Sequence, residues 1–241
     1  CHGDIKQTDP KSPLDNVHDF SGQHPSFKVT TFALKDQEWL TQRVKLAEFK
    51  KEQSNLKFNH KVHLKPEGIS TPDGDQVLQC DTCHQLDESG WYMKPMTMEK
   101  TCRSCHALSF DEDNPDRQVP HGDPDAVMTS LPEYYLRKFS EPVSISHVLN
   151  DKELRRGRPG HERKKSFECK GDPRECARTA TQSTLEELFE RTACFTCHQV
   201  NKSVSAGGFN NYSVVPVKLT SQWMTGAKFK HADHMTENCD K

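Results

Sequence analysis

The chain has 241 residues, of which only 32% are hydrophobic and 8% aromatic, and its 33 basic and 35 acidic residues leave a formal net charge of −2. A conventional core of this length would be short of apolar side chains. The balanced charge gives no general attraction to nucleic acid. The sequence also contains no run of about twenty apolar residues, which a transmembrane helix would need. Ten cysteines and thirteen histidines indicate instead a fold organised around covalent or metal cross-links.

Residues 1–57 begin with Cys1-His2-Gly3, which reads as the second half of a motif that is complete further along the chain. In the same segment, the stretch from Ser26 to Phe32 predicts a short strand, and Asp36 to Lys51 predicts a helix. His24 lies in Gly-Gln-His-Pro, a rigid setting that makes it a candidate metal ligand. An alternative for Cys1 is a lipid-modified mature N-terminus.

The complete motif is Cys-x-x-Cys-His, and it occurs three times, as Cys80-Asp-Thr-Cys83-His84, Cys102-Arg-Ser-Cys105-His106 and Cys194-Phe-Thr-Cys197-His198. This string is typical of covalent haem attachment. Two thiols three residues apart reach the two vinyl groups of a haem, and the following histidine becomes the proximal ligand of the iron. We therefore expect three haem c groups, and two further partial sites at Cys1-His2 and at Cys239.

Zinc is the alternative cofactor, because the first two cysteine pairs also form a pattern of the zinc-ribbon type. The histidine that follows all three pairs favours haem, since zinc-ribbon pairs do not require it. The two chain ends have a second interpretation: Cys239-Asp-Lys joined to Cys1-His2 would spell a complete motif between subunits of a filament.

The remaining histidines include an internal repeat of the form Phe-x-His-x-x-His, which begins at Phe58 and again at Phe229. On a helix, two histidines three residues apart share one face, so a single helical turn could provide ligands to two metals. The candidate distal ligands are His60, His63, His231 and His234 of the repeat, together with His121 and His24; the proximal candidates are His84, His106, His198 and His2.

With these motifs, the chain resembles bacterial multihaem c-type cytochromes, in particular the small tetrahaem cytochromes and their larger multihaem relatives. The resemblance implies that the two histidines of each repeat serve two separate haems. The first copy departs from the family pattern, because His63 is far from Cys80 and the loop between them is longer. We expect a mainly α fold with much irregular structure, built around haems from short helices and a few short strands.

Four segments are predicted along the chain. They are an N-terminal segment (1–57), a dihaem unit (58–136), a basic linker (137–176) and a C-terminal haem unit (177–241). Within the linker, Cys169 and Cys176 lack a following histidine, so we expect a disulfide, which suits an oxidising compartment. A capping-box signature predicts that a helix begins at Thr184 and leads into Cys194.

The predicted function is electron transfer through bis-histidine haems, with no catalysis by the chain itself. The alternatives are a subunit of an extracellular cytochrome filament, a multihaem oxidoreductase with an open iron, and a zinc-binding module. Expected partners are redox proteins, other cytochrome subunits or further copies of this chain, without nucleic acid. The resemblance implies a periplasmic or cell-surface location, because haem is attached to such motifs outside the bacterial cytoplasm.

Overall fold

The computed structural model describes residues 4–12, 16, 28–140, 167–204, 208, 210–224 and 230–235. The chain divides into two compact units. The first comprises Cys1–Ser54 and Lys218–Lys228, and the second comprises Asn55–Val217 and Phe229–Lys241.

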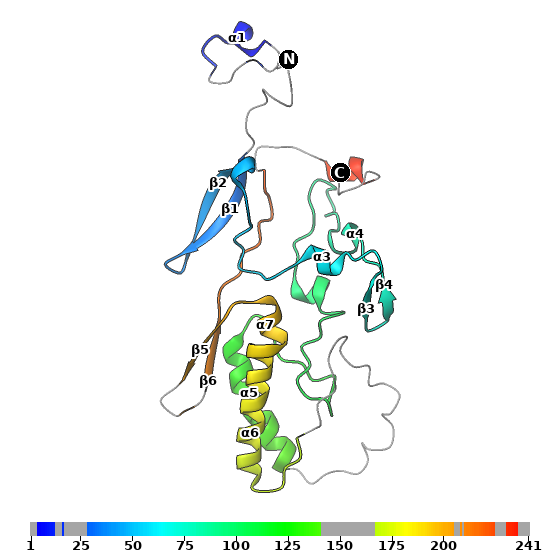
Figure 1. Cartoon of the computed structure of the whole chain (residues 1–241), viewed down its shortest axis with the longest axis vertical. Helices are drawn as coiled ribbons and strands as arrows, with labels where there is room; N and C mark the ends of the chain where they lie inside the picture. Colours follow the sequence, from blue (N-terminus) through cyan, green and yellow to red (C-terminus); the bar gives the residue numbers. More distant parts are fainter. Residues whose placement is uncertain are drawn as a thin grey trace. The chain divides into compact units, whose positions relative to one another are not determined.

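The first unit contains the short helix α1 (Ile5–Thr8), a hairpin of β1 (Lys28–Lys35) and β2 (Glu38–Lys45), and the 3₁₀ turn η1 (Leu46–Glu48) (Figure 1). The antiparallel register runs from Lys28 opposite Lys45 to Lys35 opposite Glu38. On β1, the Thr30 amide donates to the carbonyl of Trp223 at 2.6 Å, and the Trp223 ring meets that of Phe49 edge-on. The returning segment around Trp223 therefore closes this unit against the hairpin.

The helix predicted from Asp36 to Lys51 is wrong, because this stretch forms the turn and second strand of the hairpin. Asp36 and Gln37 both adopt positive φ, at 50° and 66°. Two consecutive left-handed residues reverse the chain in a two-residue hairpin turn and cannot begin a helix. The strand predicted around Ser26 to Phe32 is confirmed over its described part, as β1.

The second unit has its apolar core around two long helices, α5 (Pro124–Ser140) and α6 (Pro173–Glu186) (Figure 1). α6 continues through a π-helical turn, η4 (Glu187–Arg191), into α7 (Ala193–Cys197) and then the hairpin of β5 (Val200–Val204) and β6 (Asn210–Val214). The buried side chains recur at helical spacing: Val127, Leu131 and Tyr135 on α5, and Ala177, Ala180, Thr181 and Leu185 on α6. Thr184 lies inside α6, so the predicted helix start at that residue is wrong.

The rest of the second unit consists of short elements. They are α3 (His60–His63), β3 (Ile69–Thr71), β4 (Gly74–Gln76), α4 (Cys80–Cys83), the π-helical turn η2 (Met98–Cys102) and the 3₁₀ turn η5 (His231–His234). Across residues 55–107, all of which are described, Thr71 alone is buried. This half of the unit thus has no side-chain core of its own.

The expectation of a mainly α fold is wrong. About 35% of the structure is helical and 21% is strand, arranged as few helices, three small antiparallel hairpins and much irregular chain. β2, where a helix was predicted, and the hairpin of β5 and β6 after His198 account for most of the strand that the prediction missed.

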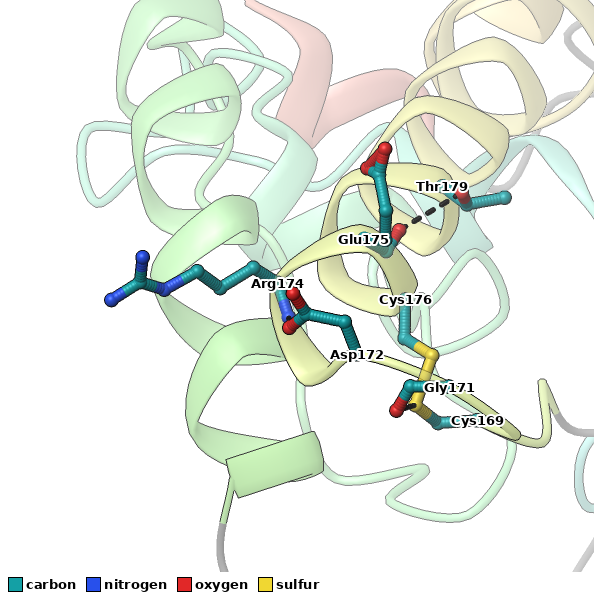
Figure 2. The surroundings of a disulfide bond; sticks show 7 residues. All are labelled: Cys169, Gly171, Asp172, Arg174, Glu175, Cys176 and Thr179. Carbon is teal, nitrogen blue, oxygen red and sulfur yellow. Dashed lines mark hydrogen bonds between the residues drawn. A yellow bond between two sulfur atoms is a disulfide. The ribbon is translucent and has the colours of Figure 1, made fainter.

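The predicted disulfide between Cys169 and Cys176 is present at the start of α6 (Figure 2). Between the two cysteines, the Asp172 side chain caps the helix by accepting a hydrogen bond from the Arg174 amide at 2.9 Å. Pro173, at the first helical position, needs no hydrogen-bond acceptor for its nitrogen. The cap and the cross-link together fix the beginning of α6.

Candidate metal centres

The three Cys-x-x-Cys-His motifs adopt the same local geometry. In each one the histidine amide donates to the carbonyl of the first cysteine at 2.8 Å, which closes a helical turn over the motif. The turns are α4 for the first motif, the end of η2 for the second and α7 for the third. None of the six cysteines is disulfide-bonded, and all six are partly buried. Both thiols and the histidine of each motif therefore extend from one short turn.

Each motif histidine lies near one histidine from elsewhere in the chain. The ring centroids are 6.2 Å apart for His60 and His84, 6.1 Å for His63 and His106, and 6.0 Å for His121 and His198. Three of the four predicted proximal ligands are thus each brought together with one predicted distal ligand. The two histidines of α3 belong to different pairs.

The spacing within the pairs distinguishes two ways of sharing a metal. With metal–nitrogen bonds of about 2.0 Å, ring centroids lie about 6.4 Å apart across a metal and about 5.2 Å apart at a tetrahedral angle. The observed values are closer to the opposed arrangement, which is the arrangement of two axial ligands of a haem. Ordinary aromatic contacts also span 4.5–7 Å, so the recurrence of one distance in three pairs is the informative feature.

The residues before α3 hold its two histidines in place. The Phe58 ring lies 4.8 Å from that of His60 and 4.7 Å from that of His63. His63 Nδ1 lies 3.0 Å from the Asn59 carbonyl oxygen. Because a carbonyl only accepts, Nδ1 carries the hydrogen, which leaves Nε2 as the nitrogen able to bind a metal. The Asn59 side chain also caps α3 by accepting from the Lys61 amide.

The third pair has a charged neighbour. Glu99 Oε1 lies 3.2 Å from His121 Nδ1, so the carboxylate accepts a hydrogen bond from that nitrogen. On the other side of the pair, burial lowers the pKa of His198, and the nearby His121 and Lys57 lower it further. The environment therefore favours a neutral His198, the form that binds metals.

The chain just before α3 also contacts the third motif. Leu56 forms a β-bridge with His198, and the Lys57 amide donates to the Cys197 carbonyl at 2.7 Å. The Lys57 ammonium lies 3.9 Å from the ring centroid of Phe195. Residues 56–63 consequently connect all three motifs.

The thiols of the three motifs influence one another. Burial raises the pKa of Cys102, and the neighbouring Cys197 and Cys83 raise it further. The pKa of Cys83 is raised by burial and by Cys105. The second motif therefore lies within electrostatic range of both the first and the third.

Several observations indicate that the site fits a haem. Two of the described buried polar atoms that lack a hydrogen-bond partner belong to the motifs, Arg103 Nε and His198 Nδ1. The apolar side chains of Phe58 and Val62, beside His60 and His63, are 47% and 51% exposed. A haem would cover apolar side chains with its porphyrin and offer propionate carboxylates to a cation such as Arg103.

The histidines of the three sites form pairs rather than larger groups. In the described part of the chain, no group of three or more His, Cys, Asp or Glu could hold a metal ion. An iron in a porphyrin needs only two ligands from the protein, because the macrocycle provides the other four.

Of the second Phe-x-His-x-x-His copy, His231 and the backbone of His234 are described, in η5. His231 Nδ1 lies 2.6 Å from the Trp91 carbonyl oxygen, and the Ala232 amide donates to the Gly90 carbonyl. His231 thus has the same Nδ1 arrangement as His63. The other predicted site residues, Cys1, His2, His24 and Cys239, lie outside the described residues, as does the His234 side chain.

Sequence reasoning missed Glu99, Arg103 and the role of Asn59. Asn59 and Arg103 occupy variable positions inside their motifs, and Glu99 lies outside them. The sequence therefore did not indicate their importance, which depends on contacts with histidines or on burial.

Comparisons with known protein families, with curated proteins and with solved structures find no match to this chain. Among the described residues, no helix is both long and apolar enough to span a bilayer.

Proposed function

We propose that the chain transfers electrons through three covalently bound c-type haems, each with two histidine ligands. The observation that carries the proposal is the pairing of every motif histidine with a second histidine at 6.0–6.2 Å. Three histidine pairs with nearly equal ring separations, each beside a cysteine pair, support one repeated cofactor rather than unrelated contacts.

The chain's own residues have defined roles in this proposal. The thiols of each motif would form thioether bonds, and each pair of histidines would occupy both axial positions. When bound, a haem supplies a one-electron iron couple, and two imidazole ligands favour a low potential. Two histidines that held each iron would keep small molecules from the metal, which would favour electron transfer over catalysis.

The contacts also suggest an order for the three sites. α3 provides His60 to the first site and His63 to the second, so these two sites are separated by one helical turn. Cys102 of the second motif interacts with both Cys83 and Cys197. We infer a path in which the second site lies between the first and the third.

His231 supports a continuation of this path beyond the three sites. Its Nδ1 is held by the Trp91 carbonyl, in the loop that follows the first motif. With Nδ1 in this contact, Nε2 would be the nitrogen that ligates a further haem, carried by this chain or by another copy. The disulfide is consistent with a location outside the cytoplasm, in the periplasm or at the cell surface.

The test is a coulometric reductive titration of the whole chain, produced in a bacterial host that attaches haem c. We expect the protein to take up at least three electrons per chain and to return all of them to an added acceptor. A chain that takes up no electrons beyond those consumed by its disulfide would overturn the proposal.

A further inference from the structure

Glu99 is placed at the third site by the local structure of its turn. It lies in η2, which leads into Cys102, and the Thr97 side chain caps this turn by accepting from the Lys100 amide. A π-helical turn is uncommon and is frequently found at functional sites. Its effect here is to bring Glu99 Oε1 within 3.2 Å of His121 Nδ1.

His121 is held from both sides in sequence. Val119 is only 3% exposed, and its amide donates to the Leu108 carbonyl. After His121, Gly122 turns the chain with a φ of 90°, and the Asp123 side chain accepts from the Ala126 amide at the start of α5. The imidazole therefore extends from a fixed backbone, and Glu99 determines what its Nδ1 contacts.

The group that Nδ1 contacts differs among the candidate ligand histidines. His63 and His231 contact neutral backbone carbonyls, whereas His121 contacts a carboxylate. A carboxylate that accepts the Nδ1 hydrogen makes the opposite ring nitrogen a more electron-donating ligand. Stronger donation and a nearby negative charge both stabilise the oxidised, more positive metal.

We propose that Glu99 is a positioning residue that lowers the reduction potential of the third site through its hydrogen bond to His121. The proposal rests on the proposed function, because it needs a haem between His121 and His198. It adds that a carboxylate outside the metal ligands tunes the third site.

The test compares Glu99→Gln with the native chain in a potentiometric titration of the holoprotein, followed by electron paramagnetic resonance. The signal of the third site is assigned as the one that disappears in His121→Ala. Glutamine keeps the size and an acceptor oxygen but removes the charge. We expect the ratio of reduced to oxidised third haem at a fixed potential to rise about tenfold, which is about 59 mV for a one-electron couple.

Two further variants make the result specific. Glu133→Gln removes a carboxylate that pairs with Arg137 on the exposed face of α5, and it should leave all potentials unchanged. Glu99→Asp keeps the charge and should shift the potential less than Glu99→Gln.

An unchanged potential in a fully haem-loaded Glu99→Gln protein would overturn this inference and leave the proposed function intact. Loss of the third haem signal in that variant would also overturn it, because Glu99 would then hold the site together rather than tune it. A native chain without haem would instead overturn the proposed function.

Discussion

The rings of His63 and His106 cross at an interplanar angle of 63°, whereas those of His60 and His84 are within 15° of parallel. The two pairs share the helix α3, so one turn of chain presents two different ligand geometries. The third pair, His121 and His198, is intermediate at 40°.

These angles predict distinct electron paramagnetic resonance signals. Parallel imidazole planes separate the energies of the iron orbitals that point between the ligands, which gives a rhombic low-spin signal. Crossed planes give a low-spin signal with a larger maximal g value. We expect His60→Ala to remove the rhombic signal and His63→Ala to remove the large-g signal. The two variants control for each other, and the assignment of ligands is wrong if the losses are exchanged or if each variant removes both.

Leu131 is the centre of the α5–α6 core and is fully buried. Leu131→Ala should lower the free energy of unfolding by about 2–5 kcal/mol, because it removes apolar contacts and leaves a cavity. Leu136→Ala, on the same helix at a position that is 42% exposed, should change it by less than about 0.5 kcal/mol. Denaturant unfolding of the holoprotein measures both, and equal effects would contradict the packing described.

Asp111 connects the loop after the second motif to α5. Burial alone would raise the pKa of its carboxyl, but hydrogen bonds from Lys138, Tyr134 and Asn114 together lower it below the usual 3.8. Lys138 Nζ lies 2.7 Å from the carboxylate. A lowered folded-state pKa means that the ionised group stabilises the fold above about pH 4, and that this stabilisation is lost as the pH falls through the folded-state pKa.

Asp111→Asn should therefore cost about 1–3 kcal/mol at pH 7, and the difference from the native chain should shrink as the pH is lowered below 3.8. The matched control is Glu133→Gln, which disrupts an exposed ion pair and should have little effect at either pH. Urea unfolding at a series of pH values gives the comparison. A cost that stays constant down to acid pH would show that the charge is not what matters.

The disulfide closes a short loop at the beginning of α6. Replacing both cysteines, Cys169→Ser with Cys176→Ser, should lower the free energy of unfolding by about 2–3 kcal/mol through the added freedom of the unfolded chain. A mild thiol reductant should produce the same loss in the native chain and none in the variant. The haem content should not change, because thioether bonds resist such reductants; a reduced haem content would assign these cysteines to a cofactor.

The sequence was most informative where the functional residues lie close together in a short motif. The Cys-x-x-Cys-His strings and the Phe-x-His-x-x-His repeat identified both members of the first two histidine pairs and His198 of the third. The sequence did not predict which two histidines form a pair, because His121 reaches His198 only through the packing of α5 against α6. Glu99 was missed for the same reason.

The local structure was predicted less well. Between Asp36 and Lys51, Trp39, Leu40, Val44 and Ala47 are spaced as they would be on one face of a helix, yet the two left-handed residues at the turn impose a hairpin. At Thr184, a correct capping pattern lies inside a longer helix, because Asp172 and Pro173 already provide its start.

The most direct test of the central claim is an optical spectrum of the purified chain, oxidised and dithionite-reduced, with and without carbon monoxide. Six histidines in three pairs predict sharp c-type bands that carbon monoxide does not change, since two histidines would hold each iron. Bands that shift with carbon monoxide would contradict the bis-histidine assignment, and a colourless protein would contradict the haem proposal altogether.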